Sequence, residues 1–124
     1  MPRTRPKHLD LTKIRLPVPA LVSILHRASG AGLFLFMPLL LWLWQESVSS
    51  QQRFEQFKVV GSHWAVKAVL IGLAWAYLHH FCAGLRHLAL DLHIGTELPA
   101  ARASSWAVLI VSFALTVVVG VILW

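Results

Sequence analysis

A regular set of polar residues lies inside an otherwise apolar stretch of the sequence. Its members follow the spacing i, i+4, i+7 and i+11, which is one stripe of a helix: His80, Gly84, His87 and Asp91. In a membrane such a stripe must face protein or a cofactor, because lipid leaves polar groups without partners. Imidazole is an axial ligand for haem iron, and a glycine one turn away removes bulk where a flat ring approaches. His80 as an axial ligand and Gly84 beside the macrocycle therefore suit a haem together.

A second polar group lies near the start of an earlier apolar stretch. His26 and Arg27 suit the two propionates of a haem, which need cationic or hydrogen-bonding partners when partly buried. Ser23 precedes Arg27 by one helical turn, so the two share a face that could hydrogen-bond the carbonyl of a small polar headgroup. The spacing predicts a ligand site at Ser23 and Arg27.

Each of these residues also has a plainer interpretation. A histidine inside the membrane can simply make a packing contact between helices. His79 points about 100° away from His80 on a helix, so we assign it to packing or partner contact and keep it as the alternative ligand. Arg27 could be an ordinary snorkelling arginine, but its pairing with Ser23 favours a functional role. Arg86 serves topology or a propionate better than a substrate.

Three apolar segments are long enough to position these groups within a bilayer, because a membrane-crossing helix needs roughly 20 residues. We predict an all-α integral membrane protein, one membrane-anchor domain over 1–124, whose three helices form a bundle with a partner subunit. The predicted elements are a cytoplasmic arm at 1–20 and transmembrane helices at about 21–44, 63–90 and 104–124. The polar linker at 45–62 is long enough for a short interfacial helix.

Composition and charge agree with a membrane location. The chain is 57% hydrophobic, with a mean hydropathy of +0.67, and Lys plus Arg outnumber Asp plus Glu by 11 to 5. In a soluble protein this charge would suggest a nucleic-acid partner. Here eight of the basic residues fall on the side of the N-terminus and three on the other, which predicts a cytoplasmic N-terminus and no nucleic-acid partner. The single Cys82 forms no CxxCH motif, so a haem would be held non-covalently.

Two stretches carry a resemblance to a known family. They are RPKHLDLTKIRLPVPALVSILHRASG at 5–30 and HHFCAGLRHLALD at 79–91, with the motifs SxxHRxS and HxxxGxRHxxxD. Together they closely resemble the cytochrome b membrane-anchor subunit of succinate dehydrogenase, respiratory complex II. The likeness extends over nearly the whole chain, including the number of predicted spans and their spacing.

The resemblance implies roles for individual residues. His80 matches the axial ligand of haem b, whose second ligand comes from the smaller anchor subunit in this family. Ser23 and Arg27 match residues of the ubiquinone site, and His26 with Arg27 match positions near the haem propionates. His87 matches a motif position that supports the cofactor.

The resemblance also implies a place in a larger enzyme. The expected partners are the smaller anchor subunit, an iron–sulfur subunit, a flavoprotein subunit, membrane lipid and quinone, in a bacterial inner membrane crossed several times by this chain. Succinate would be oxidised on another subunit, because this sequence has no glycine-rich dinucleotide fingerprint and no cysteine cluster.

Two other functions agree with the same residues. A quinol:fumarate reductase anchor performs the reverse reaction, and an anchor sequence does not set the direction. A haem-free structural anchor or an ion-translocating bundle would use the histidines for packing or proton relay.

Overall fold

The computed structural model describes residues 13–124, and this part of the chain is helical without strands. Three helices are long and apolar enough to cross a membrane, which confirms the predicted all-α membrane architecture. The predictions made for the first 12 residues lie outside the described part. The helices are α1 (Val18–Ser49), α2 (Gln51–Ser62), α3 (Trp64–Asp91) and α4 (Leu98–Leu123).

Prolines determine where two of the helices begin. α1 starts directly after Pro17 with Pro19 in its first turn, and α4 starts with Pro99 in the same position. A proline is favourable there, because the N–H that it lacks would have no partner within the helix. We expected Pro99 to belong to a linker and the last span to begin at about 104. The helix itself begins earlier, at Leu98, so Pro99 lies in its first turn and the loop between α3 and α4 is shorter than predicted. Where the membrane span begins within α4 stays a prediction.

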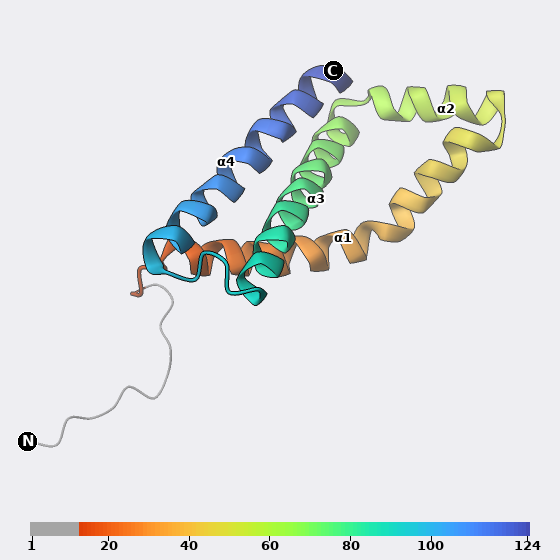
Figure 1. Cartoon of the computed structure of the whole chain (residues 1–124). Helices are drawn as coiled ribbons and strands as arrows, with labels where there is room; N and C mark the ends of the chain where they lie inside the picture. The colour runs from red at the N-terminus through yellow and green to blue at the C-terminus, as the bar shows by residue number, and fades with distance from the viewer. Residues whose placement is uncertain (1–12) are drawn as a thin grey trace, which may run out of the picture.

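The linker between the first two spans folds as the short helix α2. Ser50 caps its start by accepting a hydrogen bond from the Arg53 amide, and His63 separates its end from α3. Figure 1 shows α2 running between the end of α1 and the start of α3. α1 also ends later than the predicted 44, because polar residues up to Ser49 continue its helix.

The three long helices meet near the end of the molecule at which α1 begins. Val22 of α1, Ala83 of α3 and Val108 of α4 are buried together and form the core. Figure 1 shows the first half of α1 crossing α3 and α4, after which α1 bends away from them. Pro38 lies inside α1, and an internal proline kinks a helix because it removes one hydrogen bond and crowds the preceding turn.

Small hydroxyl residues line the buried face of α4. Ser105, Ser112 and Thr116 are buried, and each donates a hydrogen bond to a backbone carbonyl of its own helix. Their polar groups are therefore satisfied, while their small size allows close approach of helices, as is common in membranes. This face fixes how closely α4 packs in the bundle.

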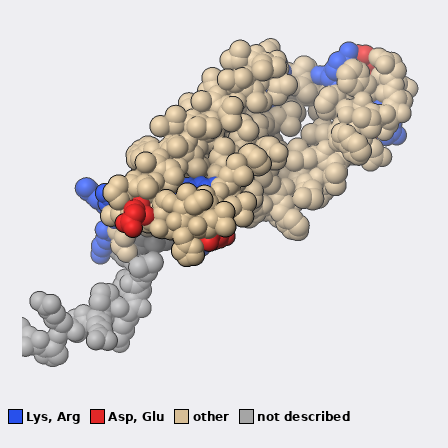
Figure 2. All heavy atoms as spheres, in the orientation of Figure 1, with Lys and Arg blue, Asp and Glu red and all other residues tan. Residues whose placement is uncertain are grey.

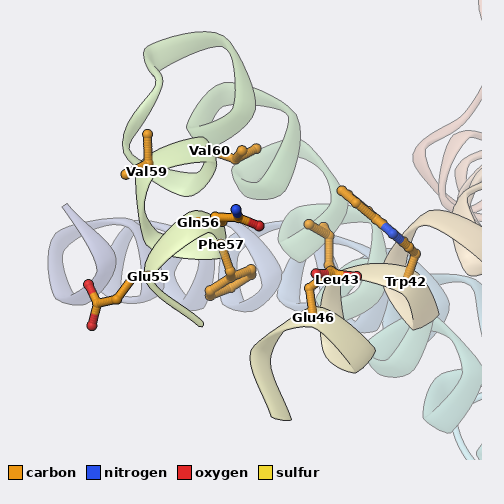
Figure 3. Close-up of a pocket in the computed structure, with 8 residues that line it drawn as sticks. All are labelled: Trp42, Leu43, Glu46, Glu55, Gln56, Phe57, Val59 and Val60. Atoms are coloured by element: carbon orange, nitrogen blue, oxygen red, sulfur yellow. The ribbon is translucent and has the colours of Figure 1, made fainter. Parts of the chain in front are cut away.

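Much of the remaining surface is apolar. Figure 2 shows charged side chains at the two ends of the molecule and a broad uncharged middle. A hollow of about 550 Å³ separates the end of α1 from α2. Figure 3 shows Trp42, Leu43 and Glu46 of α1 on one side of it and residues of α2 on the other. Such a surface suits lipid and partner helices, not water.

Candidate functional site

The candidate site lies where α1 crosses α3, beside the core. Three imidazole rings gather there from the two helices. The ring of His26 stacks on that of His80, with centroids 4.2 Å apart and planes inclined by 13°. The ring of His87 also lies beside that of His26, with the two centroids 4.9 Å apart. The structure thus brings residues from both predicted motifs into contact.

The ring of His80 is held by hydrogen bonds to α1. Its Nδ1 lies 3.0 Å from the backbone carbonyl oxygen of His26 and 3.4 Å from Oγ of Ser29. A carbonyl oxygen can only accept, so Nδ1 must carry the proton and donate it. Ser29 in turn donates to the same carbonyl at 2.9 Å. Because a neutral imidazole has one N–H, Nε2 of His80 keeps its lone pair.

This arrangement makes Nε2 of His80 a candidate ligand for a metal. Histidines that bind metals usually donate their other ring N–H to a carbonyl or carboxylate, which fixes the tautomer and raises the basicity of the ligand nitrogen. Both hydrogen bonds that the described residues offer His80 use Nδ1, so Nε2 is not engaged by them.

Two glycines allow α1 and α3 to approach at this point. A Cβ added to Gly30 would lie 2.8 Å from Cε1 of His80, which is closer than real Cβ contacts. A Cβ added to Gly84 would lie 3.6 Å from Nε2 of His26. Within this chain Gly84 therefore faces His26, and Gly30 is the glycine that makes room for the predicted ligand His80.

Ser23 and Arg27 form the pair that their spacing predicted. The Arg27 guanidinium donates a hydrogen bond of 3.4 Å to Oγ of Ser23. Arg27 is exposed on the surface of α1, and Ser23 is half-buried. A cation and a hydroxyl that face outward side by side can bind a ligand oxygen from outside this chain.

His79 occupies a different position from its neighbour His80. It is fully buried and its ring stacks on Trp75 of the same helix, with centroids 5.2 Å apart. Neither of its ring nitrogens has a hydrogen-bond partner among the described residues. Since it is enclosed by this chain, the geometry favours the packing role over contact with a partner or a cofactor.

Arg86 ties α3 to the beginning of α4. Its Nε donates to Oγ of Ser104 at 3.0 Å, and one terminal nitrogen donates to the carbonyl of Ala101 at 3.3 Å. These bonds use two of the five guanidinium N–H donors. Both roles that we considered for Arg86, in topology and toward a propionate, stay predictions.

Comparison with known proteins decides the family. A model of the succinate dehydrogenase/fumarate reductase transmembrane subunit matches residues 1–119. The chain belongs to this family. Relatives named succinate dehydrogenase cytochrome b556 subunit include those of Coxiella burnetii (43% identical, 97% of each chain), Paracoccus denitrificans (35%, 91% of this chain and 87% of the relative) and Rickettsia felis (30%, 94% and 91%). The resemblance predicted from the two motifs is thereby confirmed.

Two residues of this family member were not assigned a role from sequence. Ser29 lies inside the first motif, and Gly30 follows it directly. The only sequence signal was position, since Ser29 lies three residues after His26 and thus on a neighbouring face of the same helix. Their importance became visible only once α3 was placed against α1.

The close approach at Gly30 generates a first prediction. Gly30→Ala should displace the His80 ring and break its bond to the His26 carbonyl, at a cost of about 1–2 kcal/mol. The apparent Tm of the purified complex should therefore fall. Gly32→Ala is the matched control, because a Cβ there meets nothing within 4 Å. Equal Tm values for the two variants would show that the contact does not constrain His80.

Proposed function

We propose that this chain is the subunit of succinate:quinone oxidoreductase that binds haem b together with a smaller anchor subunit, forms part of the ubiquinone-reduction site and docks the catalytic subunits. The observation that carries this proposal is the bond from Nδ1 of His80 to the backbone carbonyl of His26, which leaves Nε2 as the ligand atom. The relatives' name, cytochrome b556, agrees with a haem b protein.

The donor set of the site fits a haem. His80 would supply one axial imidazole and the smaller anchor subunit the other. His26, Arg27 and His87 lie around the same crossing, and imidazole and guanidinium groups are suitable partners for propionates. Gly84 carries no side chain, so the surface of α3 that faces His26 has little bulk at this point. A bound haem b supplies reversible one-electron chemistry, which the protein tunes through these ligands and their hydrogen bonds.

Ser23 and Arg27 would bind ubiquinone. Ubiquinone takes up two electrons and two protons when it is reduced, and negative charge develops on its oxygens before protonation. Arg27 stabilises that charge as an exposed cation, and Ser23 orients the same oxygen by hydrogen bonding. The protons enter from the nearby aqueous face, and the electrons come from succinate oxidised on another subunit.

The distribution of charge supports the orientation of the chain. Within residues 13–124, five basic residues lie on the side of the histidine site and three on the other side, so the positive-inside rule makes the histidine end cytoplasmic. The flavoprotein and iron–sulfur subunits would dock at that end. The named relatives come from bacteria, which agrees with a bacterial inner membrane.

The haem assignment is tested by spectra of the purified complex. The dithionite-reduced minus oxidised spectrum of the wild type should show a low-spin haem b signal that His80→Ala removes or alters. His79→Ala is the comparison variant, because His79 is the neighbouring histidine and its ring stacks on Trp75. A wild type without haem absorbance would instead favour the structural anchor.

The quinone assignment is tested by separating two activities. Arg27→Ala and Ser23→Ala should each lower quinone reduction by roughly tenfold or more, because each removes a hydrogen bond to a developing charge. Succinate oxidation with a soluble artificial acceptor should persist. Arg53→Ala, at the opposite end, should change neither rate. Parallel loss of both activities in the Arg27 variant would indicate misassembly, whereas unchanged quinone reduction in both variants would contradict the assignment.

A further inference from the structure

Among the described residues, one cation at the end opposite the histidines has no acidic partner. Lys67 is half-buried near the start of α3, and its Nζ lies 4.8 Å from the ring centroid of Trp124. The other two cations of this end are neutralised: Arg53 pairs with Glu46 at 2.9 Å and Lys58 with Glu55 at 2.7 Å. Within residues 13–124, Lys67 has no such ion pair.

Lys67 borders a hollow that changes from polar to apolar. Its mouth is formed by Lys58, Ser62 and Lys67, and its walls by Leu70, Ile71 and Leu123, with a volume of about 320 Å³. A second hollow of about 370 Å³ shares Ile71 and Trp124 with the first and continues along α3 and α4 as far as Phe113. We infer that the two neighbouring hollows act as one groove, which would lead from the lysines toward the apolar middle of α4.

We propose that this groove binds one anionic phospholipid, with its phosphate at Lys67 and one acyl chain along α3 and α4. A phosphate oxygen would supply the negative charge that Lys67 lacks. Lys58 also lies at the mouth, but Glu55 neutralises its charge. The hydrogen bond from Lys58 lowers the pKa of Glu55 below its usual range.

The length of the groove agrees with this occupant. The helix between Phe113 and Trp124 rises roughly 16 Å at 1.5 Å per residue. That is about half of the ~30 Å hydrocarbon core, and hence the depth of one leaflet. Gly120 lies on this stretch and leaves the groove open, since a Cβ there would meet only Cδ1 of Ile71 at 3.9 Å.

Two other interpretations make different demands. A lysine that merely snorkels extends its ammonium into water, whereas Nζ of Lys67 lies over the indole ring of Trp124. A partner helix in the groove would need an acidic group of its own to neutralise Lys67. The lipid satisfies both the charge and the apolar length with one molecule.

The test uses the complete complex, stripped of lipid in detergent and titrated with phosphatidylglycerol or with diacylglycerol, which lacks the phosphate. Native mass spectrometry counts the bound molecules. The stripped wild type should bind one phosphatidylglycerol per copy of this chain and bind diacylglycerol more weakly. Lys67→Gln should weaken phosphatidylglycerol binding by roughly tenfold and leave diacylglycerol binding unchanged.

Two further variants make the outcome decisive. Gly120→Leu should weaken the binding of both lipids, because its side chain fills the groove. Arg53→Gln removes a cation from the same end without touching the groove and should bind as the wild type does. Equal losses in Lys67→Gln and Arg53→Gln, or equal wild-type binding of the two lipids, would overturn the proposal, as would a groove already covered by a partner subunit.

Discussion

The bond between Nδ1 of His80 and the backbone carbonyl of His26 joins the two helices that build the candidate site. It fixes the tautomer of His80, and it fixes the register of α3 against α1. The carbonyl of His26 also accepts a hydrogen bond from Ser29, so both of its lone pairs have a donor, and Gly30 leaves the space that the His80 ring needs. In an apolar environment such a bond is strong, because no water competes for either partner.

The remaining architecture follows from this crossing and from the need to hide polar groups from lipid. The buried hydroxyls of α4 satisfy themselves on their own helix, and Arg86 is satisfied by the start of α4. Exposed polar function is thus confined to the two ends of the bundle. One end holds the histidines with Arg27, and the other holds α2 and Lys67.

The sequence predicted the helical class, the three spans and the pairing of Ser23 with Arg27, because these depend on hydrophobic length and on spacing within one helix. It did not predict that Pro99 begins α4, since a proline marks a helix start as well as a break. It also did not identify Gly30, because the contact that requires it joins residues of two helices. The stripe on α3 predicted which face is polar, but only the packed structure shows that a backbone carbonyl of α1 orients His80.

A high-resolution cryo-electron microscopy map of the intact complex tests the central claim most directly, because it would show both nitrogens of His80 at once. We predict that haem iron is bonded to Nε2 of His80 and that Nδ1 faces the carbonyl of His26. Iron bonded to His79 or His26, or a His80 ring turned so that Nδ1 leaves that carbonyl, would contradict it.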